Sequence, residues 1–89
     1  MKFAIIGAGY IASIHARAVH NCGAQVVAVV EKYSDKSAAF ARQFEVSRQY
    51  STVDELLKDG GADAMVVGTP NFLHAKQTLA ALKAGIPVL

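Results

Sequence analysis

The feature that most constrains the fold is a short apolar run, Phe3–Ile6, that ends in the pattern Gly7-x-Gly9-x-x-Ala12 and leads into a helical pattern. Small residues at this spacing are typical of the turn in a dinucleotide-binding βαβ unit. Gly7 allows a tight turn, Gly9 leaves room for a pyrophosphate, and Ala12 lets the helix pack closely on the strand. The following helix N-terminus favours phosphate, since its first N–H groups are free. The predicted pyrophosphate site is the loop made of Gly7, Ala8, Gly9, Tyr10 and Ile11.

Strand-like and helix-like segments alternate along the whole chain and are joined by short connections. Strands are predicted over residues 3–6, 25–30, 46–50 and 63–67, and a fifth begins at 87–89. Helices are predicted over residues 10–22, 34–44 and 72–84, and a short one precedes Gly60. We therefore expect residues 1–89 to form one α/β domain. Its core is a Rossmann-type, doubly wound parallel sheet that is truncated at the start of the fifth strand.

Individual residues mark the ends of these predicted elements. Gly23 has the place of a residue that ends the first helix, and Ser34 is the predicted N-cap of the second. Thr52 and Glu55 form a capping box for the short helix, and Asn71 is a predicted N-cap for the last one. The third strand is short and polar, which favours a position at the edge of the sheet.

Composition excludes several classes of protein. With 53% hydrophobic and 18% charged residues, the chain is globular, and its net charge of +2 is scattered rather than gathered into a nucleic-acid surface. No apolar stretch approaches the roughly 18 residues of a membrane span, and no signal peptide is visible. Cys22 is the only cysteine, which suits a reducing cytoplasm, and it is expected to be a packed small residue. No residues have the spacing of metal ligands, so no metal is predicted.

Glu31 follows the second predicted strand, 22 positions after Gly9, where the dinucleotide fingerprint expects an acid. Its carboxylate can accept hydrogen bonds from the adenosine ribose. It also repels a 2′-phosphate, at a separation of about 4 Å by about 4 kcal/mol per charge pair at an effective dielectric of 20 and by about 1 kcal/mol in water. Lys32 can partly neutralise such a phosphate. NAD is therefore the favoured cofactor, and NADP stays possible. The alternative is that Glu31 is merely a solvated acid at a strand end.

A third loop, residues 68–74, should meet the other two at the carboxyl ends of the strands, where ligands bind in such sheets. Pro70 shapes the exit from the fourth strand, and Asn71 either caps the helix alone or also serves the ligand. His74 falls in the first turn of the last predicted helix, close to the cofactor mouth, whereas His15 shares the face of Ala12 on the first helix. The predicted cofactor residues in the loop after the second strand are Glu31 and Lys32. Those in the third loop are Thr69, Pro70, Asn71 and His74.

The whole chain resembles the N-terminal NAD(P)-binding domain of the Gfo/Idh/MocA oxidoreductases, which include glucose–fructose oxidoreductase and inositol dehydrogenase. The resemblance rests on residues 7–12 with His15 and Ala16, and on the stretches 29–31, 51–57, 63–74 and 84–89. It implies hydride transfer between a sugar or polyol carbinol carbon and the nicotinamide. It also implies that residues 7–11 hold the pyrophosphate and Glu31 the adenosine ribose, with Thr69, Asn71 and His74 on the nicotinamide side.

In that family a Glu-Lys-Pro motif with a catalytic lysine follows the fifth strand, and a C-terminal domain supplies the substrate pocket. The chain stops at Leu89, before that motif, so no catalytic residue is expected in it. The sequence is compatible with two classes of function. The chain is either the cofactor-binding half of a dehydrogenase or a stand-alone nucleotide-binding or regulatory module without catalysis. A coenzyme A domain is a third, disfavoured because Glu31 would face a ribose phosphate. A small-molecule substrate bound through the missing domain and a homo-oligomer are the expected partners, with no nucleic acid and no membrane.

Overall fold

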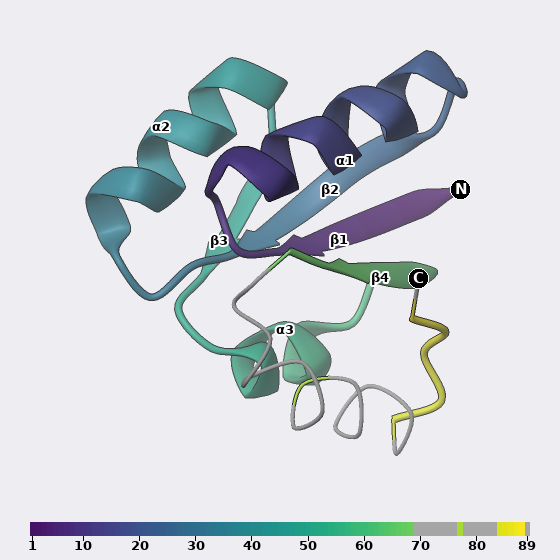
Figure 1. Ribbon diagram of the computed structural model, residues 1–89. Coiled ribbons are helices and arrows are strands. Elements are labelled where there is room, and N and C mark those ends of the chain that lie inside the picture. Colours follow the sequence, from purple (N-terminus) through teal and green to yellow (C-terminus); the bar gives the residue numbers. More distant parts are fainter. Residues whose placement is uncertain (69–76, 78–83, 89) are drawn as a thin grey trace.

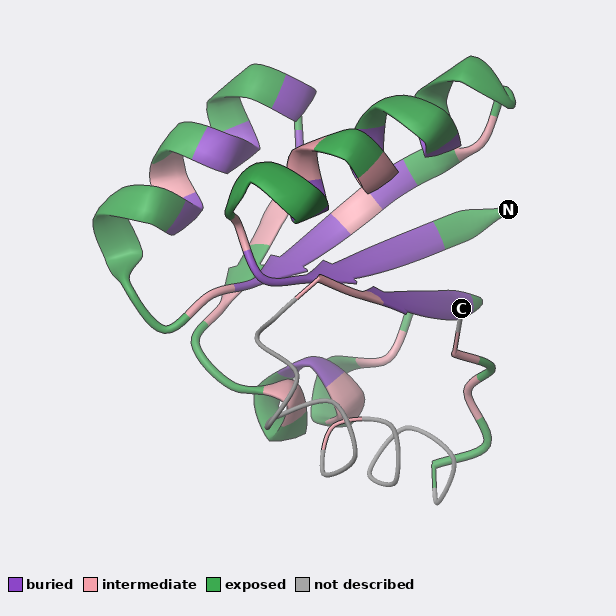
Figure 2. Cartoon of the chain, viewed as in Figure 1, coloured by how far each residue is buried: buried purple, intermediate pink, exposed green. Residues whose placement is uncertain are grey.

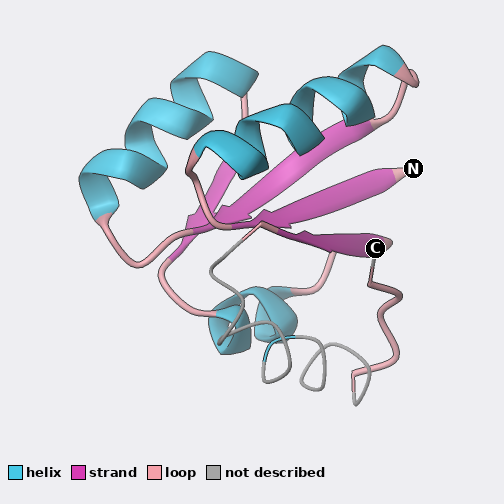
Figure 3. Cartoon of the chain, in the orientation of Figure 1, coloured by secondary structure: helices cyan, strands magenta, loops and turns pink. Residues whose placement is uncertain are grey.

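The computed structural model describes residues 1–68, 77 and 84–88, and all structural statements refer to these. Four parallel strands form one sheet in the order β3-β2-β1-β4 (Figures 1 and 3). The strands are β1 (Lys2–Ile6), β2 (Gln25–Val30), β3 (Arg48–Tyr50) and β4 (Ala64–Val67). The named helices are α1 (Tyr10–Asn21), α2 (Ser34–Phe44) and α3 (Val53–Asp59). The predicted alternation of strand and helix is confirmed over this part of the chain.

The helices cover both faces of the sheet (Figure 1). Helices α1 and α2 lie on one face, where their buried residues meet Phe3, Ile5 and Val66 in one apolar cluster. Helix α3 lies on the other face, where Leu56 packs with Ile6 and Met65 in a second cluster. The central strands are therefore buried on both sides, as Figure 2 shows. This explains why β1 reads as an unbroken apolar run.

Strand β2 contains a β-bulge that its sequence does not reveal. Phe3 pairs with Val26 and Ala4 with Ala28, so Val27 is an extra residue in the ladder. The Val27 carbonyl accepts a hydrogen bond from Ser47 Oγ at 3.4 Å. Beyond this β-bulge the strand alternates regularly, which brings Val30 into register with Ile6 at the carboxyl end.

Helix α1 ends as predicted at Gly23, whose φ of 79° is left-handed. The N–H of Gly23 donates to the His20 carbonyl and that of Ala24 to the Val19 carbonyl, which are the two bonds of a Schellman motif. The prediction for the start of α2 is wrong in one respect. Ser34 is the first helical residue, and the N-cap is Tyr33 in an extended conformation, with no side-chain cap bond.

The sheet's margins agree with the sequence apart from small shifts. Strand β3 lies at the edge as predicted but starts at Arg48 instead of Val46, and β4 starts at Ala64 instead of Asp63. The predicted fifth strand begins with a parallel bridge between Val88 and Met65. The predicted helix over 72–84 and its cap Asn71 lie outside the described residues, apart from Gln77, which is helical, and Ala84, which lies in a turn.

Helix α3 has the strongest local cap in the described part of the chain, so we expect Thr52→Ala to destabilise the protein by about 1 kcal/mol. Thr52 Oγ1 accepts the Glu55 N–H at 3.2 Å and also donates to the Glu55 carboxylate. The mutation leaves that N–H without its partner. Thermal unfolding followed by far-ultraviolet circular dichroism measures the loss, and Thr52→Ser, which keeps the hydroxyl, is the matched control.

The same cap makes the stability depend on pH. Hydrogen bonds from Ser51, and then from Thr52, lower the pKa of Glu55 below its ordinary value of 4.5. A lowered folded-state pKa adds stability above the unfolded pKa, and this is lost as the pH falls through the folded value. The difference in the free energy of unfolding between the wild type and Thr52→Ala should therefore become smaller as the pH falls. A difference in stability that stays constant below pH 4.5 would show that the Thr52 cap does not depend on the ionised carboxylate of Glu55.

Candidate functional site

The three predicted site loops begin at the carboxyl edge of the sheet, where hydrogen bonds hold their first residues in place. The Gly7 N–H donates to the Val30 carbonyl at 2.7 Å, and the Gly68 N–H donates to the Ile6 carbonyl at 2.8 Å. The Glu31 N–H donates to the Tyr50 carbonyl at 2.9 Å. These bonds extend the strand ladders by one residue and fix where the loops begin. Because the strand order reverses between β1 and β4, this edge is the topological switch point of the sheet.

Helix α1 begins at this edge, and the positive end of its dipole has no negatively charged side chain beside it in the helix's own first turn. Its N-cap is Gly9, no side chain caps it, and no acidic residue stands in its first turn among the described residues. Helices α2 and α3, by contrast, carry Asp35 and the pair Asp54 and Glu55 in their first turns. The first N–H groups of α1 and its dipole therefore favour an anion.

The two glycines of the fingerprint have different reasons to be glycine. Gly7 has a φ of 100°, a conformation that side chains rarely adopt, so the turn itself requires it. Gly9 has a φ of −88°, which any residue can adopt. A Cβ built on Gly9 meets no described atom within 4 Å. Neither backbone strain nor packing in the described part of the chain explains why residue 9 is a glycine.

Gly68 borders the candidate site, and the sequence analysis placed it in the third loop without assigning it a role. A Cβ there would stand 3.2 Å from both the Cα and the N atom of Ala12, and 3.3 Å from its Cβ. Gly68, directly after β4, therefore packs against the start of α1, and Gly68 and Ala12 must both be small. A glycine directly after an apolar strand was the available signal, but its partner is visible only in three dimensions.

Glu31 and Lys32 occupy the loop after β2. Glu31 is half-buried, and its carboxylate accepts the Lys32 N–H at 2.9 Å. The Lys32 side chain is exposed, with its ammonium 5.6 Å from the centre of the Tyr33 ring. The structure thus places both residues at the predicted edge, beside the loop of Gly7. The remaining predicted residues, Thr69, Pro70, Asn71 and His74, lie outside the described part of the chain.

The other reactive side chains lie away from this edge. His15 lines a groove of about 260 Å³ over Phe3 and Val66, beside α1. His20 is exposed, with its ring centre 6.0 Å from that of Phe44. Cys22 is exposed, so its expected packing is wrong, because it caps the C-terminus of α1 instead of continuing the buried face. Among the described residues, no three acidic, histidine or cysteine side chains gather to hold a metal.

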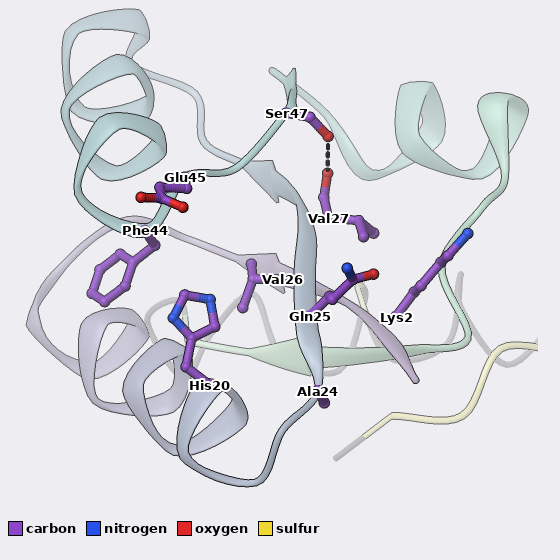
Figure 4. A pocket seen from close by; sticks show the side chains of 9 residues that line it. All are labelled: Lys2, His20, Ala24, Gln25, Val26, Val27, Phe44, Glu45 and Ser47. Atoms are coloured by element: carbon purple, nitrogen blue, oxygen red, sulfur yellow. Dashed lines mark hydrogen bonds between the residues drawn. The ribbon is translucent and has the colours of Figure 1, made fainter.

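A second hollow, of about 400 Å³, lies at the opposite end of the sheet (Figure 4). Lys2 and Gln25, which are the first residues of β1 and β2, line it together with His20, Phe44 and Glu45. This hollow is on the amino side of the strands, whereas the fingerprint glycines are on the carboxyl side. It therefore does not belong to the candidate site.

The sequence as a whole matches a known family. A model of the family described as "Oxidoreductase family, NAD-binding Rossmann fold" matches residues 1–89. The chain belongs to the Gfo/Idh/MocA oxidoreductases. It is an NAD-binding Rossmann domain of that family, as the sequence resemblance predicted.

Curated relatives show the same kinship and differ in length. The chain is 36% identical over 89 residues to a 1,5-anhydro-D-fructose reductase of Ensifer adhaerens, covering 99% of this chain and 27% of the relative. It is 32% identical to an inositol 2-dehydrogenase of an Arthrobacter species, covering 100% and 27% respectively. The chain thus spans about a quarter of the length of these relatives.

Solved structures agree on the fold. A WlbA dehydrogenase from Bordetella pertussis, solved with NADH and UDP-GlcNAcA, matches with a TM-score of 0.92 and 28% identity over 98% of this chain and 27% of its own. A myo-inositol 2-dehydrogenase from Lactobacillus plantarum matches with a TM-score of 0.89 and 27% identity over 99% and 26%. The predicted doubly wound fold and the NAD class of cofactor are confirmed. Within the described residues, no helix is both long and apolar enough to cross a membrane.

Proposed function

We propose that this chain is the cofactor half of a dehydrogenase that moves hydride between NAD and a carbinol carbon of a sugar, polyol or related substrate. The observation that carries the proposal is Gly9, which lacks a side chain for no conformational reason and leaves open space at the uncapped end of α1. A dinucleotide pyrophosphate fits there, because it needs close backbone approach and a positive helix end. The curated relatives named as an anhydrofructose reductase and an inositol dehydrogenase support the substrate class.

Each predicted site residue has a part in this proposal. Residues 7–11 hold the pyrophosphate through backbone N–H groups, and Glu31 accepts the hydroxyls of the adenosine ribose. Lys32 flanks that ribose, and Thr69, Pro70, Asn71 and His74 serve the ribose and nicotinamide side of the cofactor. The bound nicotinamide supplies the hydride chemistry. The chain's own residues bind it and orient it.

The proposal extends to the whole protein. The relatives are much longer, which supports a substrate-binding part that this chain does not contain. Ile11 and Ile14 remain exposed on α1, and they favour association with another surface, including a second copy of the protein. A cytoplasmic setting is part of the same proposal, consistent with the single free cysteine.

We expect the isolated chain to bind NAD several-fold more tightly than NADP. The Glu31 carboxylate stands at the carboxyl end of β2 and repels a 2′-phosphate there. Calorimetric titration with both cofactors measures the preference. Glu31→Ala should weaken NAD binding and narrow the difference between the cofactors, while Asp63→Ala, at the amino side of β4, should change neither. Tighter NADP binding that Glu31→Ala leaves unchanged would remove Glu31 from this role.

A further inference from the structure

The hollow at the amino side of the strands (Figure 4) is lined by polar side chains that have no polar partner in the described part of the chain. Lys2, His20, Gln25 and Glu45 all line it. Among the described residues, their side chains form no hydrogen bond and no ion pair. The volume of the hollow, about 400 Å³, lies in the range of small-molecule sites. It therefore offers a ligand both charged groups and space.

Glu45 has a backbone conformation that favours a different residue type. It follows α2 with a φ of 56° and a ψ of 44°, and it is the only non-glycine residue with a positive φ in the described part of the chain. This left-handed conformation is unfavourable for a residue with a Cβ, and glycine or asparagine usually takes it after a helix. The Glu45 side chain is exposed. A strained residue whose side chain the fold does not use is typical of a functional site.

Two helices end on the Glu45 side of the hollow. His20 lies in the last turn of α1, and its ring centre is 6.0 Å from that of Phe44, the last residue of α2. The C-terminal ends of both helix dipoles are therefore close to each other, and each carries a partial negative charge. The carboxylate of Glu45, the C-cap of α2, adds to them. This side of the hollow favours a cationic group.

The opposite side of the hollow favours an anionic group. Lys2 and Glu45 lie at its two ends, and the amide of Gln25 lies between them (Figure 4). Asp63 accepts the backbone N–H of Lys2 at 2.8 Å, but it is not among the residues that line the hollow. Val26, which is buried, contributes an apolar wall between the two ends. A ligand that matches these groups has two opposite charges and an apolar portion.

We propose that the hollow binds a free α-amino acid with an apolar side chain. The ammonium group of the ligand meets the carboxylate of Glu45 and the two helix C-termini, and its carboxylate meets Lys2 and the amide of Gln25. Its side chain packs on Val26 and the ring of His20. The hollow is at the opposite end of the sheet from the cofactor loops, so this inference goes beyond the proposed function and does not rest on it. Because the charged groups are exposed, we expect a dissociation constant of about 1 mM.

The test is a titration of the ¹⁵N-labelled chain with L-phenylalanine, followed by the NMR shifts of its backbone amides. The amides of residues 24–27 and 45–47 should shift, whereas those of Gly7 and Gly9 should not. Two analogues each lack one charge of the amino acid. These are 3-phenylpropanoate, without the ammonium group, and 2-phenylethylamine, without the carboxylate. Each should bind about fivefold more weakly than L-phenylalanine.

Matched variants assign the two charges to their residues. Glu45→Gln should weaken L-phenylalanine binding about fivefold and leave 3-phenylpropanoate binding unchanged, whereas Lys2→Met should weaken the binding of both. Asp54→Asn removes an exposed carboxylate from α3, on the other face of the sheet, and should change neither affinity. Glu45→Asn should also weaken L-phenylalanine binding. It should unfold at a higher temperature than the wild type, because asparagine adopts the left-handed conformation more readily.

Equal binding of L-phenylalanine and its two analogues would overturn the inference, since the charges would then have no part in recognition. It is also overturned if no amide around the hollow shifts, or if Glu45→Gln and Lys2→Met bind as tightly as the wild type. Circular dichroism shows whether each variant is folded. Gly9→Val keeps this test separate from the proposed function, because it should lose NAD binding and keep L-phenylalanine binding. Loss of both ligands in Gly9→Val would place the amino acid at the cofactor loops and overturn the inference.

Discussion

Replacing Gly9 by valine is expected to abolish NAD binding while leaving the protein folded. The Gly9 backbone is extended, with a φ of −88° that valine adopts readily, and a Cβ there meets no described atom within 4 Å. The branched side chain would instead fill the space over the first N–H groups of α1. A pyrophosphate must approach those N–H groups to within hydrogen-bond distance, so its binding is lost. Calorimetry measures the affinity, and thermal unfolding measures the stability.

Gly68→Val is the matched variant with the opposite expected outcome. A Cβ at Gly68 would come within 3.2 Å of the Ala12 backbone, which cannot move without displacing α1. Overpacking of this kind costs about 1–3 kcal/mol, so we expect a clear loss of stability. Comparing Gly9→Val with Gly68→Val thus distinguishes a glycine that ligand binding requires from a glycine that packing requires. Unchanged NAD affinity in Gly9→Val would show that the dinucleotide lies elsewhere on the chain.

Local sequence patterns predicted the elements of this fold well, because each has a local physical cause. The valine-rich run before Glu31 gave the bounds of β2, and Gly23 marked the end of α1 through its left-handed conformation. The β-bulge at Val27 was not predictable, since a run of apolar residues has no alternation to break. Ser34 was a reasonable cap by type, but Tyr33 takes the extended N-cap conformation, so the helix begins one residue earlier than a Ser34 cap implies.

In the candidate site, too, residues with a local cause could be predicted from the sequence, and residues that depend on tertiary contacts could not. Gly7 and Glu31 were found because their roles depend on position relative to a strand end. Gly68 was assigned no role, because its reason for being small is Ala12, a residue distant along the chain. Contacts of this kind depend on how the loop and the helix are placed, which no spacing rule records.

We expect the 89-residue chain to bind NAD without catalysing hydride transfer from any polyol or sugar. The substrate carbon must be held against the nicotinamide while a base removes the hydroxyl proton. Among the described residues, the histidines do not supply this base at the carboxyl edge. His15 lines a groove over Phe3 and Val66, and His20 lines the hollow at the amino side of the strands. Positioning contributes about 7–11 kcal/mol to lowering such a barrier, and one wall of a cleft cannot provide it.

The measurement is NADH formation by the chain, at saturating NAD, against a panel of inositols, sugars and sugar acids. Calorimetry on the same preparation shows that the cofactor is bound, so an absence of turnover reports on the missing chemistry and not on an empty site. Gly9→Val, which should not bind the cofactor, gives the background rate. Turnover that saturates with one substrate and vanishes in His74→Ala would contradict the expectation. It would show that this domain positions the substrate and moves the proton by itself, and that the greater length of the relatives is not needed for the reaction.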